Sequence, residues 1–483
     1  MVKINIYADT IIGGANTLII KNIVSVLFIM KSLLLRKVGP VIGGILIRGD
    51  ADAKIENVAT RNSHKMTKDT LVFYREKLKV PTNLHSCIIV TDQKKVEALF
   101  PSSYTIVYVK KVWVAFYKFI HYYRRMFRIP VIGVTGTCGK TTTKEMIAHI
   151  LSPEMNIVKT VLSQNGLSHN LKYLLEIDDK TDAAIIEMGV NSPGHIMQTA
   201  SYFRPTIGLI TTIGTDHLQG FKNHHEYVKE KESMLKAVHP GGTMILNADN
   251  YYSRKLRTNK FKGKLIYIGE SDFADYKIMK MKYDQAGMKY MIGNRGRIYV
   301  GNVPGFGKHN VYNAIFSIAA TGLLGIDINT AIERLKTYKP VQRHLELSPG
   351  INNSTIIDDT WNTNPTSIQA ALEVLEQVSK DKKSIAVLGD IEELGAHSQE
   401  EHQKIGTLIV KHNIDYLITI GDQAKEIGTK ARQLGMDPNC IYSVKHEDHL
   451  LRILMNHADK HTTILIKTSM RNSFRGLLSK LKG

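Results

Sequence analysis

Cysteine is scarce in this chain. Its 483 residues include only three cysteines, and no two of them form a Cys-x-x-Cys pair. Cys87, Cys138 and Cys440 lie far apart, which argues against a disulfide framework and against a structural zinc site. Such a pattern is typical of a reducing compartment, so we expect a cytoplasmic protein.

Long uncharged hydrophobic runs are lacking as well. The most apolar stretch, Thr17–Leu35, is interrupted by Lys21 and Lys31, and its longest uncharged run is Asn22–Met30. A helix that spans a bilayer needs about 20 apolar residues, and a signal peptide would be followed by a small-residue cleavage site. We therefore predict no transmembrane segment and favour a buried helix. Peripheral association through a surface helix is the alternative.

Acidic residues are too few to balance the basic ones. Lysine and arginine total 64 against 44 acidic residues, which gives a formal net charge of +20. Such an excess suits partners that are nucleic acids, membrane surfaces or strongly anionic substrates. The densest basic cluster, residues 110–125, is interleaved with aromatic side chains and could bind RNA by stacking. We favour the alternative that this cluster is a basic amphipathic helix whose aromatic face packs on the next domain.

No internal repeat or low-complexity linker divides the chain, although its length is that of about two to four domains. We predict three α/β domains: 1–127, 128–340 and 341–483. Short apolar runs followed by turn residues indicate a mostly parallel central sheet and a Rossmann-like C-terminal domain. The predicted strands are Ile45–Arg48, Thr70–Phe73, Cys87–Thr91, Tyr104–Val109, Val131–Thr135, Ala183–Glu187, Ile207–Ile213, Met244–Leu246, Leu265–Ile268, Ser354–Ile357, Ser384–Leu388, Tyr416–Ile420 and Thr463–Ile466.

Helices and hairpins are predicted between these strands. Hairpin turns are expected around Gly287, Gly293-Asn294 and Gly301-Asn302. The predicted helices are His309–Leu324, Asn329–Tyr338, Ser367–Val378, Gln399–Lys411 and Gln423–Gln433.

The most informative motif lies between Val131 and Met146. A β-branched run leads into Gly136-Thr137-Cys138-Gly139, then Lys140-Thr141-Thr142, and a helix is predicted from Lys144 onward. This order aims backbone N–H groups and a helix dipole at one point, where Lys140 adds charge and Thr141 can ligate Mg²⁺. Val134 stands where the usual Walker motif has its first glycine. We interpret the motif as a triphosphate site; a chance Gly-Lys-Thr turn is the alternative.

Several polar groups follow predicted strands. Glu187 ends a strand in the central region, where a carboxylate can hold Mg²⁺ beside the phosphate loop. Asp216-His217 follows the next strand, and His217 is either a metal ligand or a structural hydrogen-bonding group. Asp358-Asp359 ends a strand of the third region and precedes Asn362-Thr363-Asn364-Pro365. This block is either only a helix N-cap leading to Ser367 or a group that reaches a nucleotide bound between domains. Arg343 is either a cationic clamp or a surface residue.

Taken in order, these blocks resemble the Mur ligases, ATP-dependent enzymes that add amino acids to the cell-wall peptide precursor. The similar branch is the one that adds D-alanyl-D-alanine. The resemblance covers roughly residues 130–470. The matching blocks are Val134–Thr142, Glu187–Gly189, Thr212–Phe221, Lys308–Ala314, Asp358–Pro365 and Leu388–Gly395.

The resemblance implies a role for each matching residue. Gly136, Thr137, Gly139, Lys140, Thr141 and Thr142 would hold the ATP phosphates, with a first Mg²⁺ on Thr141. Glu187 and His217 would ligate a second Mg²⁺, together with Lys231 carried as a carbamate; Lys229 is the competing assignment. His309, Asn310 and Asn313 would face the adenine, and Arg343 and Asp359 would reach the nucleotide from the C-terminal domain. Asn364, Lys467 and Ser469 would lie near the amine substrate. Lys140, Lys231, His217 and Arg343 would be the catalytic set.

The N-terminal region departs from the family pattern. Asn62-Ser63-His64 stands where the family has an Asp-Ser-Arg block that holds the UDP end of the precursor. The small molecule that donates the carboxylate is therefore one of two: the UDP-linked muramyl tripeptide, or another cell-wall, capsule or metabolite carboxylate. A basic P-loop NTPase that acts on nucleic acid is the alternative from another class. For the ligase we expect a monomer with no nucleic-acid partner.

Overall fold

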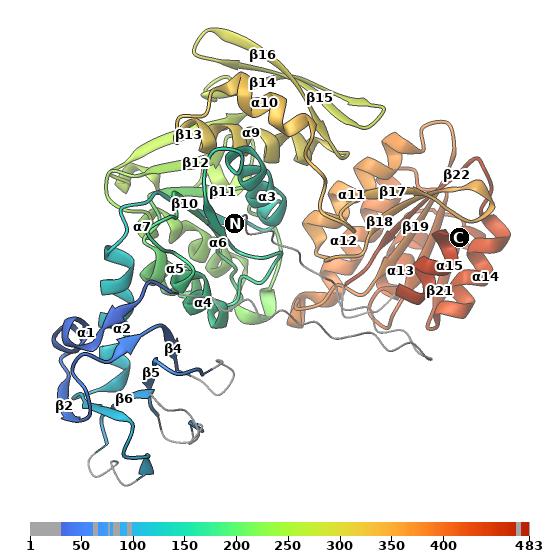
Figure 1. The fold of residues 1–483 in the computed structure, drawn as a ribbon. Helices are drawn as coiled ribbons and strands as arrows, with labels where there is room; N and C mark the ends of the chain where they lie inside the picture. The colour runs from blue at the N-terminus through green and yellow to red at the C-terminus, as the bar shows by residue number, and fades with distance from the viewer. Residues whose placement is uncertain are drawn as a thin grey trace.

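The computed structural model describes residues 30–60, 66–75, 78–80, 87–93, 99–469 and 475–482. Three large sheets follow one another along the chain, from the N-terminal region through the centre to the C-terminal region (Figure 1). The Asn62-Ser63-His64 block lies outside the described residues, and so does most of the predicted helix at Thr17–Leu35. The last part of that prediction is wrong, because Leu33–Leu34 is a strand, β1, paired with β3 (Lys54–Ile55).

The N-terminal sheet has five strands in the order β2-β7-β6-β5-β4. Its central strands are apolar and almost wholly buried, as expected of parallel strands covered on both faces. The strands are β2 (Ile45–Arg48), β4 (Asn57–Ala59), β5 (Thr70–Phe73), β6 (Cys87–Thr91) and β7 (Thr105–Tyr108). Helix α1 (Leu35–Ile42) packs against α2 (Val112–Arg125).

The central sheet has nine strands in the order β16-β15-β14-β13-β12-β11-β8-β10-β9. The strands from β9 to β14 pair in parallel, and β14, β15 and β16 form an antiparallel ribbon at one edge (Figure 1). The strands are β8 (Val131–Thr135), β9 (Ile157–Lys159), β10 (Ala183–Glu187), β11 (Ile207–Ile210), β12 (Thr243–Asn247), β13 (Lys264–Gly269), β14 (Tyr276–Asp284), β15 (Gly287–Asn294) and β16 (Arg297–Pro304).

Helices cover both faces of the central sheet. One apolar core lies between the sheet and α3, α9 and α10, and a second continues into the N-terminal domain. The helices are α3 (Lys140–Leu151), α4 (Asn170–Leu175), α5 (His195–Phe203), α6 (His224–Glu232), α7 (Met234–Ala237), α8 (Tyr251–Arg254), α9 (Lys308–Gly322) and α10 (Ile328–Lys336).

The C-terminal sheet has six strands in the order β17-β18-β22-β19-β20-β21, all parallel except β17. Its strands are β17 (Glu346–Pro349), β18 (Thr355–Asp359), β19 (Lys383–Gly389), β20 (Tyr416–Ile420), β21 (Ile441–Val444) and β22 (Thr462–Lys467). Its helices are α11 (Pro365–Val378), α12 (Ser398–Lys411), α13 (Lys425–Gln433), α14 (Glu447–His457) and α15 (Arg475–Lys482).

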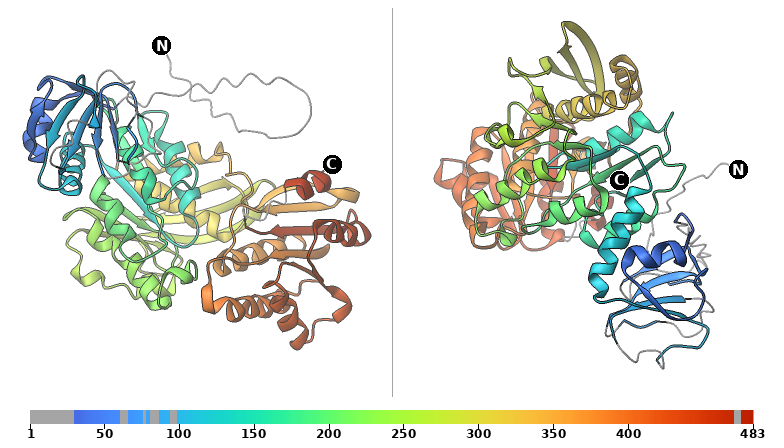
Figure 2. Two further views of the ribbon diagram at one scale, coloured as in Figure 1. Left: turned by 90° about the horizontal axis from the view of Figure 1, so that it is seen from below. Right: turned by 90° about the vertical axis from the view of Figure 1, so that its left-hand side faces the viewer.

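The N-terminal and C-terminal domains lie at opposite ends of the molecule (Figure 2). We keep domain boundaries near residues 127 and 340 as a proposal.

Three local predictions differ from the structure. Helix α3 begins at Lys140 instead of Lys144, because Gly139 is left-handed (φ 82°) and turns the chain directly into the helix. Strand β11 ends at Ile210, since Thr211 turns its hydroxyl to the carbonyl of Cys138 (2.5 Å). Gly301-Asn302 lies inside β16 and not in a turn. The hairpin predicted around Gly293-Asn294 turns at the next two residues, Arg295-Gly296, where both φ values are positive.

The basic aromatic segment is the predicted amphipathic helix, and its packing on the central domain is confirmed. Phe119 and Tyr123 of α2 are fully buried, and the Tyr123 hydroxyl lies 2.9 Å from the carbonyl oxygen of Ile177. Arg124 is buried and donates to the carbonyl oxygens of Phe203, Phe127 and Ile129 at 2.7, 2.6 and 3.2 Å. None of the described helices is long and apolar enough to cross a membrane.

The Arg124 contacts generate the first prediction. Arg124→Met leaves three carbonyl oxygens at the junction of α2 and the central domain without their donor, so we expect a loss of roughly 3 kcal/mol in the free energy of unfolding. Urea unfolding followed by the tryptophan fluorescence of the chain, which comes from Trp113 on α2 and from Trp361, measures it. The control is Arg125→Met, because Arg125 is exposed. Equal losses in the two variants would contradict the role of Arg124.

Candidate active site

The phosphate loop connects the buried strand β8 to α3. A Cβ atom on Gly139 would lie 2.4 Å from Oδ1 of Asn313 in α9, and one on Gly136 would lie 2.0 Å from Oγ1 of Thr211. Asn313 also accepts a hydrogen bond from Thr143 (3.2 Å). Neighbouring elements therefore press directly on the loop, and only glycine fits at these two positions.

Polar side chains stabilise the phosphate loop through hydrogen bonds. The Thr137 hydroxyl lies 2.8 Å from the hydroxyl of Tyr227 and accepts from the backbone N–H of Gly214 at 2.9 Å. Lys140, the first residue of α3, folds its ammonium back to the carbonyl oxygen of Thr137 (2.9 Å). Thr142 is half-buried on the first turn of the same helix. Burial raises the pKa of the Cys138 thiol to about 11, so this loop thiol is protonated and unreactive at neutral pH.

Thr141 and Glu187 are brought together as the sequence predicts. The Thr141 hydroxyl donates to Oε2 of Glu187 (3.0 Å), and the amide of Asn165 donates to Oε1 (2.8 Å). Among the described residues, no group of three or more His, Cys, Asp or Glu side chains could hold a metal ion. A hydroxyl and a carboxylate beside a phosphate loop nevertheless fit Mg²⁺, which takes one or two protein oxygens and completes its shell with phosphate oxygens and water.

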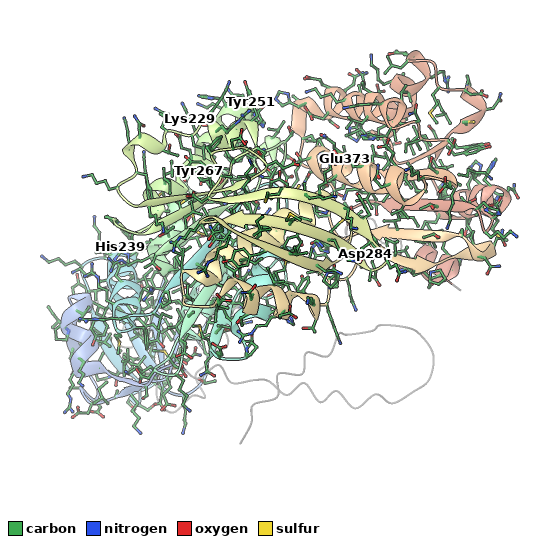
Figure 3. All side chains as sticks on the ribbon, turned by 90° about the horizontal axis from the view of Figure 1, so that it is seen from above. Lys229, His239, Tyr251, Tyr267, Asp284 and Glu373 are labelled. Atoms are coloured by element: carbon green, nitrogen blue, oxygen red, sulfur yellow. The ribbon has the colours of Figure 1, made fainter. Side chains whose placement is uncertain are left out.

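Lys231 lies beneath the phosphate loop. Its ammonium is buried and donates to the carbonyl oxygen of Gly136 (3.0 Å) and to the Thr135 hydroxyl (3.3 Å). Burial, reinforced by the positive charge of Lys140, lowers the pKa of Lys231 well below its usual value. Lys229 is exposed at the outer rim of the central domain (Figure 3). The structure therefore favours Lys231 over Lys229 as the lysine that serves the site.

His217 contacts the C-terminal domain. Its Nδ1 is hydrogen-bonded to the carboxylate of Glu393, and its Nε2 lies 3.6 Å from Oδ2 of Asp216. Asp216 in turn accepts from the amide of Asn364 (3.2 Å). Within the described part of the chain, no contact joins His217 to Glu187, so their shared metal stays a prediction.

Arg343 and Asp359 lie on the C-terminal side of the site. The guanidinium of Arg343 donates to the hydroxyl and carbonyl oxygens of Thr360 at 2.8 and 2.6 Å. Asp359 pairs with Lys467 (2.7 Å), a fully buried lysine that also donates to the carbonyl oxygen of Asn362 (2.8 Å). Asp359, predicted to reach the nucleotide, and Lys467, predicted to lie near the amine substrate, thus form one buried ion pair.

The start of α9 faces the same ion pair. Burial lowers the pKa of His309 to about 4, while the charge of Asp359 acts in the opposite direction. Asn310 donates its amide to the carbonyl oxygens of Pro304 and Gly305 (2.7 and 3.1 Å), which secures the turn from β16 into the helix. Asn313 packs on the phosphate loop, as described above. The adenine roles of these three residues stay predictions.

Asn364 caps α11 and also joins two domains. Its Oδ1 accepts from the backbone N–H of Ser367 (2.8 Å), so the predicted N-cap is confirmed. The same oxygen lies 3.4 Å from the thiol sulfur of Cys138, which donates to it. The C-terminal domain therefore touches the phosphate loop directly. Within that domain, Ser469 donates to Glu392 (3.1 Å).

Four residues of this site were missed in the sequence: Lys144, Asn165, Tyr227 and Glu393. Lys144 lies in the phosphate-loop motif, but an isolated lysine on a helix is usually a surface residue. Asn165 and Tyr227 have no motif of their own, and only the fold brings them to Glu187 and Thr137. Glu393 was part of a matching block without an assigned role.

The fold and the site define a P-loop enzyme whose nucleotide loop is covered by a Rossmann-like C-terminal domain. Two family models match the chain: the Mur ligase middle domain over residues 134–321 and the Mur ligase glutamate ligase domain over residues 345–470. The chain belongs to the Mur ligase family, and it is an ATP-dependent ligase.

Relatives and solved structures agree with this membership. The chain is 30% identical over 362 residues to the UDP-N-acetylmuramoyl-tripeptide–D-alanyl-D-alanine ligase of Synechocystis, covering 74% of this chain and 76% of the relative. The ligase of that name from Bacillus subtilis is 28% identical over 370 residues, covering 76% and 79%. A crystal structure of MurF from Acinetobacter baumannii has a TM-score of 0.80 at 22% identity and covers 94% of this chain and 99% of its own. MurF from Thermotoga maritima in complex with ADP has a TM-score of 0.72 at 19% identity, covering 88% and 96%. These structures support the fold.

The packing of Gly139 generates the second prediction. Gly139→Ala forces its new methyl group into Asn313, so we expect the affinity for ADP to fall at least about tenfold, measured by calorimetry. Gly194→Ala is a matched control, because Gly194 also precedes a helix with a left-handed φ of 90° but has no atom within 4 Å of its Cβ position. Equal affinities in the two variants would show that loop packing does not control nucleotide binding.

Proposed function

We propose that this chain joins D-alanyl-D-alanine to the carboxylate of a UDP-N-acetylmuramoyl tripeptide at the expense of ATP, in peptidoglycan precursor synthesis. The observation that carries this proposal is the convergence of Thr141, Glu187 and buried Lys231 on a phosphate loop that the C-terminal domain covers. The names of the curated relatives support the choice of substrates.

The reaction has two steps. The carboxylate of the tripeptide attacks the γ-phosphorus of ATP, which releases ADP and leaves an acyl phosphate. The amine of the dipeptide then attacks the acyl carbon, and inorganic phosphate leaves with its bonding electrons as the amide forms. Charge builds on the phosphoryl oxygens in the first step, and Lys140 is placed on the loop to stabilise it. Arg343, held by Thr360, would contribute from the C-terminal side when that domain closes.

Two Mg²⁺ ions would supply the remaining positive charge for phosphoryl transfer. Thr141 would hold the first ion, and Glu187 with His217 the second. Lys231 would serve as a carbamate, because a plain ammonium would repel the metal. The depressed pKa of Lys231 supports this modification, since only a neutral amine attacks CO₂. Asp216, Glu230 and Glu187 act to raise this pKa, but burial and the charge of Lys140 outweigh them.

A second carboxylate donor is the alternative, because Asn62-Ser63-His64 departs from the family pattern. In that case the same chemistry would act on a different cell-wall, capsule or metabolite carboxylate. We further propose that the enzyme is a cytoplasmic monomer that acts on small molecules. Family membership favours the ligase over an NTPase that acts on nucleic acid.

The substrate proposal yields the third prediction. With ATP and Mg²⁺, phosphate release by the purified enzyme should require both a UDP-muramyl tripeptide and D-alanyl-D-alanine. A panel of UDP-muramyl peptides and candidate amines, followed by phosphate release, measures this dependence. The tripeptide alone and the dipeptide alone are the controls. If none of the UDP precursors on the panel supports phosphate release, the assignment moves to the second donor. Stimulation of phosphate release by DNA or RNA would favour the NTPase.

The carbamate yields the fourth prediction. Lys231→Ala should lower turnover at least about 100-fold, because the metal loses its anionic ligand. Lys229→Ala should stay within about twofold of the unmodified enzyme, because Lys229 is exposed. Phosphate release measures both, in buffers with and without bicarbonate. Bicarbonate-independent turnover that persists in Lys231→Ala would remove the carbamate role.

A further inference from the structure

Lys144 is a buried cation to which the sequence analysis assigns no role. It lies on α3, one turn after Lys140, and its side chain has no solvent exposure. Its ammonium donates to the carbonyl oxygens of Thr160 and Leu162 at 2.7 and 2.6 Å and pairs with Glu145 at 2.8 Å. Burying an ammonium is costly unless such partners compensate it, so its position calls for a specific reason.

The two carbonyl groups belong to the segment Thr160–Asn165 that follows β9. This segment contacts Glu187 twice: the Thr160 hydroxyl accepts from the Glu187 backbone N–H (3.0 Å), and the Asn165 amide donates to Oε1 (2.8 Å). Leu162 within it has a left-handed φ of 46°, a strained conformation for a leucine. The ammonium of Lys144 stabilises this strained turn through the carbonyl groups on either side of it.

Lys144 also balances charge at the site. Its Nζ lies 3.9 Å from Oε2 of Glu187, too far for a hydrogen bond but close enough for electrostatic attraction. Glu145 is the second carboxylate on the same ammonium, and Lys159 pairs with its other oxygen. Burial is the largest effect on Glu145 and would raise its pKa, yet the two lysines together lower it. Lys159 touches Glu145 without reaching Glu187, which makes it a natural control.

We infer that Lys144 is a positioning residue for the metal-binding carboxylate: it shapes the Thr160–Asn165 turn so that Asn165 and Thr141 hold the two oxygens of Glu187 beside the phosphate loop. This inference rests on the proposed function, because it assigns Glu187 to Mg²⁺. Lys144 itself touches neither nucleotide nor substrate. Residues that orient a metal ligand in this way commonly change metal affinity by about 10–100-fold when they are removed.

The test measures Mg²⁺-dependent ADP binding by calorimetry in the full chain, with turnover as a separate readout. Lys144→Met keeps the length and burial of the side chain but removes its donors. We expect its ADP affinity in EDTA to stay within about threefold of the unmodified protein, whereas the Mg²⁺ concentration for half-maximal enhancement of ADP binding rises at least about tenfold. Lys159→Met should leave both values within about twofold.

A purely structural role predicts a different result. It would lower the melting temperature and the fraction of binding-competent protein without moving the Mg²⁺ midpoint, and that outcome overturns the inference. A double-mutant cycle adds a second check: if Lys144 acts through Asn165, the pair Lys144→Met and Asn165→Ala should shift the midpoint no more than about twofold beyond the larger single shift. Additive shifts overturn the inference.

Should Lys144→Met fail to fold, Asn165→Ala alone decides the matter, since an unchanged Mg²⁺ midpoint in that variant also overturns the inference. The proposed function fails separately, if the unmodified enzyme releases no phosphate with any UDP-muramyl peptide. Its Mg²⁺-dependent ADP binding would still report on Lys144.

Discussion

The parallel register of the central sheet is the constraint on which the site depends. Val134 of β8 is paired with Glu187 of β10 on one side and with Leu209 of β11 on the other. The carboxyl ends of three strands therefore stop at one edge, where the phosphate loop, the Glu187 carboxylate and the turn at Thr211 meet. A shift of one residue in the register of β10 would turn Glu187 to the opposite face of the sheet and separate it from Thr141.

Positive charge is concentrated around this edge. Lys140, Lys144 and Lys231 lie around the phosphate loop and Glu187, and Lys144 and Lys231 are buried. Their partners are mostly backbone carbonyl groups, which can accept a hydrogen bond without neutralising the charge. Lys140 forms no ion pair in the described part of the chain, so its charge is available to the phosphate oxygens of a polyanionic ligand.

The C-terminal domain completes the site through a small number of polar contacts. Asn364 reaches both Cys138 and Asp216, and Glu393 holds His217. The N-terminal domain, by contrast, shares a continuous apolar core with the central one. The N-terminal domain is thus joined to the ATPase unit by a shared apolar core, whereas the C-terminal domain reaches the phosphate loop and its surroundings through hydrogen bonds.

By itself the sequence determined the phosphate loop, the strands that precede Glu187 and His217, and the placement of α2, α3 and α9 to α13, because these depend on local patterns of glycine, β-branched residues and apolar periodicity. It also indicated the Asn364 cap, a local hydrogen bond. The resemblance favoured Lys231 over Lys229, and only the tertiary structure shows that Lys231 is buried against the phosphate loop while Lys229 is exposed. Asn165, Tyr227 and Lys144 were equally beyond sequence patterns, since their partners are brought to them by the packing of distant segments.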